Sequence, residues 1–211
     1  SPSTSVALLG DLVDSRSLPD REAAQRDLEA SLHAVNRLVG ALDPLHPTVG
    51  DEFQGIYDSL GKAIEAAYLL RALLPAELDF RAGLGRGQVV VLNSLHGIQD
   101  GPAWWSARAA VDAAEKSAAS PRSRTTRTSF ASDADDDSLV AAVRAALLAV
   151  DFIWGSWSAP TREIAAALIR GASQQQVAQQ LGVTPSAVSQ RVRRDGVGVV
   201  MESLSRLREL R

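Results

Sequence analysis

The segment that most constrains the fold is residues 48–57, TVGDEFQGIY. Gly50 and Asp51 are interpreted as a two-residue turn, because both residue types tolerate the positive φ angles that hairpin turns need. Apolar residues lie on both sides of the turn, so we expect a β-hairpin with Asp51 and Glu52 at its tip. Carboxylates in this position suit Mg²⁺, which prefers oxygen ligands and usually takes one or two of them from protein. The alternative interpretation is an acidic surface turn without a ligand.

A second acidic strand end precedes the hairpin. Residues 6–10, VALLG, form a continuous apolar run, which is typical of a strand buried on both faces. Asp11 follows this run and therefore sits at the carboxyl end of the strand, where open α/β sheets place their binding sites. A helix is predicted to begin at residues 19–21 and to end at Gly40. We expect Asp11 and Asp51 to lie close together as ligands of Mg²⁺ or Mn²⁺.

Alternating glycines mark a later strand. Residues 80–92 predict a strand, a glycine-rich turn and a second strand, and Gly83, Gly85 and Gly87 would leave one strand face without side chains. Either a helix packs closely on such a face or a ligand approaches its backbone. Residues 100–103, DGPA, then predict the start of a helix, and at least one of its two tryptophans is expected to fill a core or an interface.

The middle of the chain is predicted to link two parts. Residues 61–74 form an amphipathic helix, and residues 117–137 are rich in Ser, Thr, Arg and Asp, which predicts a mobile segment with one edge strand at 125–131. The acidic run at 133–137 is interpreted as the cap of the next helix, 138–154, rather than as a metal site.

The last fifty residues predict short helices at 161–170, 174–181 and from Thr184 onward, followed by a closing helix at 199–210 that supports dimerisation. Thr184 is a good N-cap and Pro185 suits the first helical position. Gly182 allows the sharp turn, Ala178 allows close helix contact, and the small core is expected to contain Val177, Leu181, Val188 and Val192. This spacing is that of a helix-turn-helix.

The outer face of the third helix carries polar and basic side chains. Serine and glutamine can read base edges, whereas arginine can read guanine or hold phosphate. The residues assigned to double-stranded DNA are Thr184, Ser186, Ser189, Gln190, Arg191, Arg193 and Arg194. A helical protein-interaction module is the alternative.

The charge of the chain is unevenly distributed. The net charge of −3 alone argues against a nucleic-acid-binding protein. However, residues 1–158 carry 14 basic and 21 acidic side chains, whereas residues 159–211 carry 8 basic and 4 acidic ones. An acidic body with a basic terminal segment is the asymmetry expected when one end of a protein approaches phosphate.

Composition excludes several other classes. The absence of cysteine rules out disulfides and thiolate metal sites and fits a reducing compartment. No apolar run approaches the roughly 18–20 residues that span a bilayer, and the first residues show no signal-peptide pattern. We therefore expect a cytoplasmic protein without membrane contact.

Four motifs, taken in order, resemble the SatD-like bacterial family over roughly residues 5–195. They are Gly10-Asp11…Ser15-Arg16, Thr48-x-Gly50-Asp51-Glu52-Phe53-Gln54-Gly55, Arg81-x-Gly83-x-Gly85-x-Gly87 and Asp100-Gly101-Pro102-Ala103…Ala107-Arg108. The same order is distantly similar to the class III nucleotide cyclase domain and its GGDEF relatives. In those proteins an aspartate that ends the first strand and one at the central hairpin bind two metals, and the matching residues here are Asp11 and Asp51.

This resemblance implies an α+β fold with a palm or ferredoxin-like (nucleotide-cyclase-like) domain and a metal or nucleotide pocket. The residues that it assigns to a ligand are Ser15, Arg16, Glu52, Gln54, Arg81, Asp100 and Arg108. Cyclases place an asparagine that steadies the nucleotide four residues before the arginine, where this chain has Trp104. No purine-selecting lysine–aspartate pair is apparent either. The resemblance therefore does not establish catalysis, and whether the chain is an enzyme stays open.

These observations predict a palm domain over residues 1–135, a linking helix over 136–158 and a helix-turn-helix domain over 159–211. The favoured hypothesis is a homodimeric DNA-binding transcriptional regulator, whose palm domain senses a nucleotide second messenger or serves for dimerisation. One alternative is a metal-dependent cyclase or phosphoryl-transfer enzyme, in which Arg108 stabilises phosphate charge. The other is a structural dimerisation domain with vestigial acids.

Overall fold

The computed structural model of the chain describes residues 4–93 and 98–211, and Arg16, a predicted ligand-binding residue, has a side chain outside the described part. The fold is α+β, as predicted. The strands of the main sheet are β1 (Ser5–Leu12), β2 (Asp43–Pro47), β3 (Glu52–Tyr57), β4 (Phe80–Gly87) and β7 (Thr128–Ser132). The helices are α1 (Arg21–Leu38), α2 (Leu60–Leu73), α3 (Pro102–Ala118), α4 (Asp137–Gly155), α5 (Ala159–Ile169), α6 (Gln174–Leu181), α7 (Pro185–Arg194) and α8 (Val197–Leu207).

The main sheet has the strand order β2-β3-β1-β4-β7. The central strand β1 is antiparallel to both β3 and β4, and β7 adds to the edge in parallel with β4. The predicted edge strand in the Ser/Thr-rich segment is thus confirmed as β7. A separate two-stranded sheet, β5 (Val90–Asn93) and β6 (Ile98–Asp100), follows β4.

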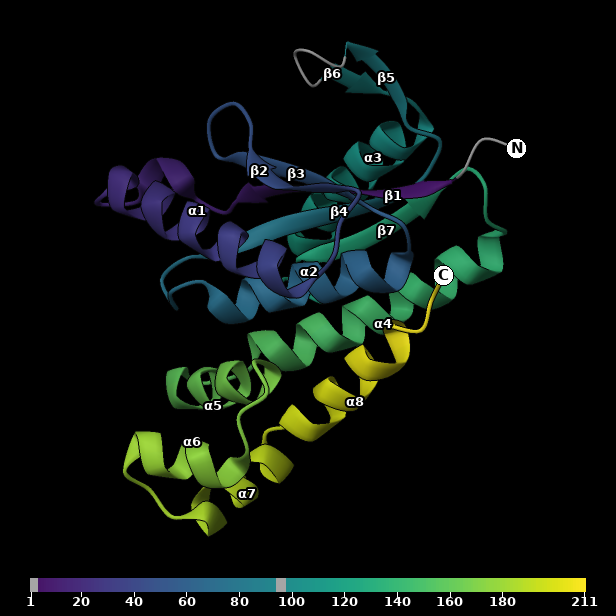
Figure 1. Cartoon of the computed structure of the whole chain (residues 1–211). Coiled ribbons are helices and arrows are strands. Elements are labelled where there is room, and N and C mark those ends of the chain that lie inside the picture. The colour runs from purple at the N-terminus through teal and green to yellow at the C-terminus, as the bar shows by residue number, and fades with distance from the viewer. Residues whose placement is uncertain (1–3, 94–97) are drawn as a thin grey trace.

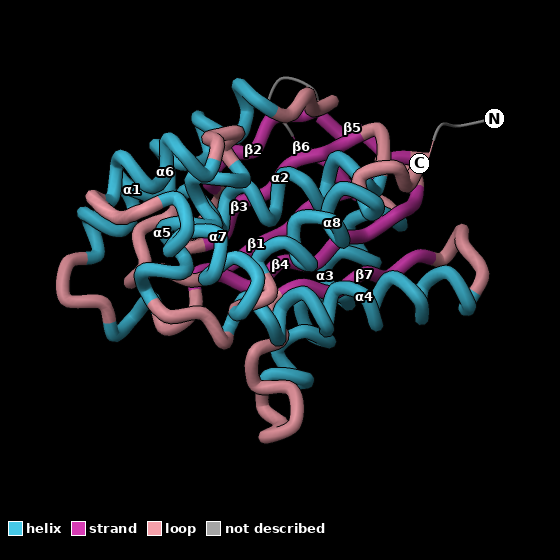
Figure 2. The backbone as a smooth tube through the Cα atoms, turned by 90° about the horizontal axis from the view of Figure 1, so that it is seen from below, coloured by secondary structure: helices cyan, strands magenta, loops and turns pink. Residues whose placement is uncertain are grey.

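Helices cover both faces of the sheet (Figure 1). Helix α3 lies on one face, where it contacts β4, β7 and β1. Helices α1 and α2 lie on the other face, and α4 to α8 lie beyond them. In the view from below, α8 lies between α2 and α4 (Figure 2), and it contacts both of them.

The alternating glycines allow α3 to lie directly against β4. A Cβ atom at Gly83 would lie 2.1 Å from the carbonyl oxygen of Ala107, and one at Gly85 would lie 2.1 Å from the backbone nitrogen of the same residue. The helix-packing alternative is therefore the one that the structure contains. The predicted glycine-rich turn is wrong, because Gly83, Gly85 and Gly87 all lie within the strand.

Helix starts agree closely with the sequence signals. The side chains of Asp20, Asp136, Ser173 and Thr184 each accept a hydrogen bond from a backbone N–H in the first turn of α1, α4, α6 and α7. Such caps satisfy donors that have no partner inside the helix. The acidic run before α4 is thus a helix cap, as predicted.

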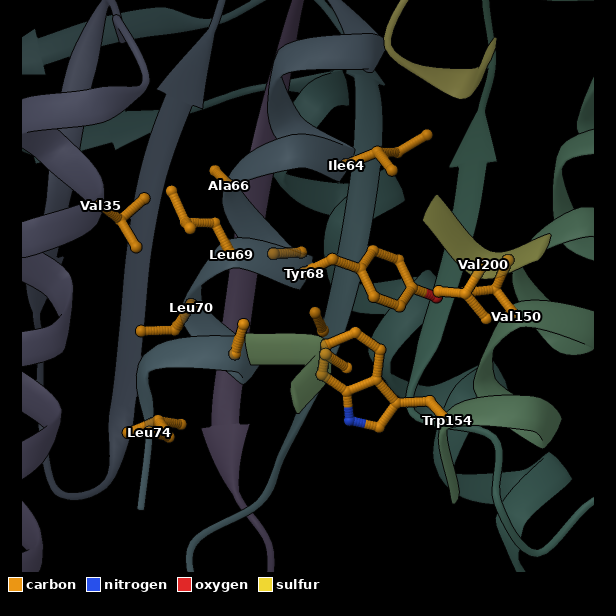
Figure 3. Close-up of a cluster of buried hydrophobic side chains, with 14 of the residues drawn as sticks. Val35, Ile64, Ala66, Tyr68, Leu69, Leu70, Leu74, Val150, Trp154 and Val200 are labelled. Atoms are coloured by element: carbon orange, nitrogen blue, oxygen red, sulfur yellow. The ribbon is translucent and has the colours of Figure 1, made fainter. Parts of the chain in front are cut away.

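One hydrophobic core extends from the sheet into the C-terminal helices. Tyr68 of α2 and Trp154 of α4 pack against each other with ring centroids 5.9 Å apart (Figure 3). Val177 and Val188, predicted to form the core of the last helices, are fully buried in this same cluster. Leu181 is an exception, since 37% of it is exposed. The predicted division at residues 136–158 stays a prediction, and the parts on either side of it share a core.

A buried carboxylate ties α4 to α2 and to the start of β7. Asp151 accepts hydrogen bonds from the Tyr68 hydroxyl at 2.8 Å and from Arg71 at 2.9 Å. It also accepts the backbone N–H groups of Arg127 and Thr128, each at 2.7 Å. Burial raises the pKa of Tyr68 well above its ordinary value, and the charge of Asp151 raises it further, so the phenol stays a donor to this carboxylate.

Within the described residues, α4 is the one helix long and apolar enough to cross a membrane by length and composition alone. The sequence analysis predicted no apolar run approaching this length, and α4 is an exception to that prediction. In the structure α4 packs against β7 and α8, and Asp151 is held in the polar network. One face of the helix is buried by these contacts, whereas Leu148 and Phe152 on α4 are exposed.

The glycine contact can be tested by substitution. Gly85→Ala places a methyl group where the backbone of α3 already lies, and overpacking of this kind costs about 1–3 kcal/mol or more. Gly40→Ala is the matched control, because nothing lies within 4 Å of a Cβ atom at that position. Urea unfolding should show a large loss of stability for Gly85→Ala and little change for Gly40→Ala. Equal effects would contradict this account of the glycines.

Candidate functional site

Charged residues from three adjacent strands meet at one end of the sheet. Asp11 on β1 lies directly opposite Glu52 on β3 and directly opposite Arg81 on β4. Residues opposite each other in antiparallel strands point to the same face. All three side chains therefore point to the face that α3 covers.

Helix α3 adds charged partners to this row. Arg81 donates to the Asp11 carboxylate at 2.8 and 3.4 Å and to Glu115 of α3 at 3.0 Å. Arg108 of α3 grips both oxygens of Glu52 at 3.0 and 3.1 Å. The acidic row is thus a set of arginine–carboxylate pairs that join the sheet to α3.

These pairs stabilise the charged forms of their arginines. The hydrogen bond with Asp11 raises the pKa of Arg81, and the hydrogen bond with Glu52 raises the pKa of Arg108. Bidentate pairs of this type are stronger and more directional than simple ion pairs. Asp11 is the more enclosed acid, with a side chain 20% exposed against 35% for Glu52.

Asp51 has a different environment from Asp11. Its carboxylate accepts a hydrogen bond from the Ser15 hydroxyl, and Asp51 and Ser15 line a hollow beside residues of α1. Two of the predicted site residues, Ser15 and Asp51, are thereby brought together. Asp11 instead lies next to Glu52, beneath α3.

The carboxylates of this row are held by arginines rather than gathered around an empty centre. Among residues 4–93 and 98–211 there is no group of three or more His, Cys, Asp or Glu side chains placed to hold one. Both oxygens of Asp11 already face Arg81, so a divalent ion would have to displace that guanidinium. Binding of Mg²⁺ or Mn²⁺ by Asp11 and Asp51 stays a prediction.

A hollow of about 530 Å³ lies beside the Glu52–Arg108 pair and brings together three of the predicted ligand residues, Glu52, Gln54 and Arg108. Its lining also includes Gln99 and Trp104. The indole Nε1 of Trp104 and the Oε1 of Gln99 are buried and have no hydrogen-bond partner among the described residues. Buried polar atoms without partners are uncommon and costly, and these two belong to residues in the wall of the hollow.

The two tryptophans of α3 differ in environment. Trp104 packs against a small cluster between β1 and α3, which agrees with the prediction that at least one of them fills a core. Trp105 is 63% exposed, and its indole N–H donates to Asp100 at 2.8 Å. Asp100, a predicted ligand residue, also accepts the backbone N–H of Gly101. It therefore holds the start of α3 in place and is not among the residues lining the hollow.

The predicted DNA-facing residues lie on and beside α7. Ser186, Gln190 and Arg193 are exposed at positions that share one helix face. The Thr184 hydroxyl caps the helix, and Arg194 pairs with Asp195 at 2.7 Å. Ser189 and Arg191 are half-buried.

The comparison with protein families agrees with the resemblance noted from the motifs. The model of the SatD family matches residues 5–210. The chain belongs to the SatD family. A search of curated proteins finds no match.

Sequence reasoning missed several residues of this SatD-family site. Glu115 follows Arg108 by seven residues, which is two helical turns, so its place on the same side of α3 could have been inferred. Gln99 lies on β6, next to the Asp100 motif. Nothing in its spacing pointed to a hollow.

The pair between Arg81 and Asp11 should contribute to stability. Arg81→Met leaves the enclosed Asp11 carboxylate without its guanidinium, which should cost about 1–3 kcal/mol. Arg108→Met is the comparison, because Arg108 is 49% exposed and Glu52 can be solvated when its bidentate partner is lost, so this variant should cost less than Arg81→Met. Urea unfolding measures both variants. Adding Asp11→Asn to Arg81→Met should restore part of the loss, and an equal cost for the two single variants would contradict the proposed difference.

Proposed function

We propose that this SatD-family protein is a DNA-binding transcriptional regulator whose α+β portion acts as a sensor or dimerisation unit. The observation that carries the proposal is the pair α6 and α7 with the exposed polar face of α7. Ser186, Gln190 and Arg193 on that face make no side-chain hydrogen bond or ion pair with the described part of the chain. A surface helix with such residues free is suited to base edges and phosphates.

The geometry around α7 supports a helix-turn-helix. Gly182 follows α6 in the left-handed conformation, with φ 65°, so the chain reverses there without Cβ strain. Val177 of α6 and Val188 of α7 are buried between the helices. The far end of α7 is anchored, because Asp195 accepts the Thr161 hydroxyl at 2.6 Å and its carbonyl accepts the Trp157 indole at 2.7 Å. A rigid support of this kind is what a recognition helix needs.

The strand order supports the palm-like interpretation of the α+β portion. In β2-β3-β1-β4 the helix after β1 and the helix after β3 lie on one face, which is the arrangement expected of a palm or ferredoxin-like unit. The hollow beside Glu52 and Arg108 is the favoured place for a nucleotide second messenger. Its lining is polar, with Gln54, Gln99 and the half-exposed Arg108. A phosphate that reaches Arg108 would have to share the guanidinium with Glu52, which now holds it.

DNA binding can be tested on the full chain by electrophoretic shifts against genomic fragments at two salt concentrations. Arg193→Ala should weaken binding to all sequences and reduce the salt slope by about one. Gln190→Ala should instead reduce the sequence preference at one base pair. The free energy that discriminates the right base from the wrong one should fall by about 1–3 kcal/mol. Arg194→Ala should weaken DNA binding less than Arg193→Ala, because the Arg194 guanidinium is already paired with the Asp195 carboxylate.

The control variant is Arg206→Ala on α8, where the guanidinium pairs with Glu202 on the same helix. One helix of this kind buries little DNA surface, so useful affinity requires two copies spaced about 34–36 Å apart. We therefore propose a cytoplasmic homodimer and a site with twofold character. If the full chain does not bind DNA at low salt, with or without added nucleotides, the regulator proposal fails.

A second candidate function is a metal-dependent nucleotide cyclase. The observation that favours it is the meeting of Asp11, Glu52 and Arg108 at one sheet end. We expect cyclase activity to be weak or absent. Trp104 can only donate through its indole, whereas an asparagine amide also accepts, and Arg81 occupies the carboxylate that a metal would need.

The test is to incubate pure protein with ATP or GTP and Mg²⁺ or Mn²⁺ and to measure cyclic product. Little or no product is expected. Robust product that disappears in Asp51→Asn would establish the enzyme in place of the sensor.

A further inference from the structure

A third hollow, of about 560 Å³, lies where the sheet meets the C-terminal helices, and we call it the junction hollow. Its lining comes from the end of α2, the loop before β4, the approach to β7, and α4, α5 and α6. It includes Asp79, Arg127, Trp154, Arg162, Arg170 and Leu181. A volume of this size lies within the range of about 300–1,000 Å³ that is usual for small-ligand sites.

The sheet side of the junction hollow is rigid and its charges are paired. Arg127 donates to Asp79 at 2.6 Å and to the backbone carbonyls of Arg124 and Thr126. Arg71 and Asp151 form the buried pair that ties α2 to α4. These groups are held by protein partners, so they form a fixed wall and are not the groups that would bind a ligand.

The α5 side contains cations without acidic partners. Arg162 and Arg170 lie eight residues apart with Ala166 between them, so all three share the helix face that lines the hollow. Neither arginine has an ion pair with any side chain in the described part of the chain. The Nε of Arg162 is moreover buried and lacks a hydrogen-bond partner there. A guanidinium left without an anion inside a hollow is a ready partner for a carboxylate or phosphate group.

Acidic residues do not cancel this preference. Glu77 and Glu163 also line the hollow, but both are exposed, so water screens their charges. Asp79 and Asp151 are already paired with arginines. The unpaired charge that is partly enclosed is therefore positive.

The remaining lining is apolar. Leu181, assigned to a core by its spacing, instead leaves over a third of its surface exposed and lines the hollow from α6. Trp154 and Ala166 add apolar surface from α4 and α5. An exposed leucine facing a hollow gains stability when an apolar group covers it.

We propose that the junction hollow binds a small organic anion. Its acidic group would pair with Arg162, with Arg170 close by on the same helix face, and its apolar body would lie against Leu181, Ala166 and Trp154. The site is separate from the Glu52–Arg108 hollow, which lies on the opposite face of the sheet beneath α3. The ligand class is thus defined by two features together, an acidic group and an apolar body.

Ligand binding here would bear on α7. Helix α6 lines the junction hollow and packs directly on α7, so an occupant that holds α6 against the sheet also sets the position of α7. This regulatory consequence rests on the proposed DNA-binding function. The existence of the binding site does not.

The site is tested by isothermal titration of the full chain with phenyl phosphate, benzoate and inorganic phosphate, without DNA. At least one aromatic anion should bind with one-to-one stoichiometry and at least tenfold more tightly than inorganic phosphate, which cannot use the apolar lining. Arg162→Gln should weaken that binding about tenfold, which corresponds to the loss of about 1.4 kcal/mol. Leu181→Ser should also weaken it, and the exposed Arg206→Gln should leave it unchanged.

Circular dichroism and thermal unfolding establish that each variant is folded. If Arg162→Gln does not fold, Arg162→Lys takes its place, since it keeps the charge and loses the fork geometry. It should still weaken binding, by a factor smaller than about ten. Failure of both aromatic anions to bind below about 1 mM, or binding that Arg162 and Leu181 variants leave unchanged, overturns the proposal.

The regulatory arm repeats the DNA shift assay with and without the aromatic anion that binds. DNA affinity should change at least threefold in the parent protein and remain unchanged in Arg162→Gln. Anion binding without any DNA binding leaves the site established and removes the regulator proposal. DNA binding without anion binding removes the junction-hollow proposal and leaves the regulator proposal standing.

Discussion

The buried Asp151 carboxylate is the contact on which the union of the two parts of the chain depends. It lies on α4, and its partners come from α2 and from the start of β7. Taking a charge out of water is costly unless it is paired and fully hydrogen-bonded. Here Tyr68, Arg71 and two backbone N–H groups satisfy it together. Burial raises the pKa of Asp151, while Arg71, the backbone N–H groups of Arg127 and Thr128 and the Tyr68 hydroxyl oppose that rise by stabilising the carboxylate.

This anchoring makes the C-terminal helices part of the same packed body as the sheet. The hydrophobic cluster that begins at β1 continues through Tyr68 and Trp154 to Val177 and Val188. The backbone N–H of Gly61 at the start of α2 also donates to the carbonyl of Leu210, and a Cβ atom at Gly61 would clash with the backbone of Arg208. A displacement of one side relative to the other would therefore require the shared core to repack, because packed cores are not freely deformable.

Local signals predicted the elements well and the pairings poorly. Caps at Asp20 and Thr184 depend on a residue and its neighbours a few positions away, so the sequence alone reveals them. The glycine face of β4 is likewise visible as an alternation. In contrast, the partner of Asp11 depends on which residues of β3 and β4 lie opposite it. In the observed register Glu52 and Arg81 lie opposite Asp11. Asp51 accepts a hydrogen bond from Ser15 instead. Leu181 was misassigned for a similar reason, since periodicity identifies an apolar face without showing whether another element covers it.

The arginine–carboxylate pairs that join the sheet to α3 also bear on the choice between sensing and catalysis. Helix α3 lies directly against β4, because the glycine face brings the two backbones into contact. Arg108 and Glu115 are thereby held over Glu52 and Arg81, and the four charges neutralise each other in place. A metal-dependent enzyme needs carboxylates that are free to take a cation, and releasing Asp11 would leave Arg81 with Glu115 as its one remaining acidic partner in the described part of the chain. An anionic ligand at Arg108 would leave Asp11 and Arg81 paired, but it would have to share the guanidinium with Glu52. The proposed sensing therefore requires fewer of these pairs to be broken than metal-dependent catalysis does.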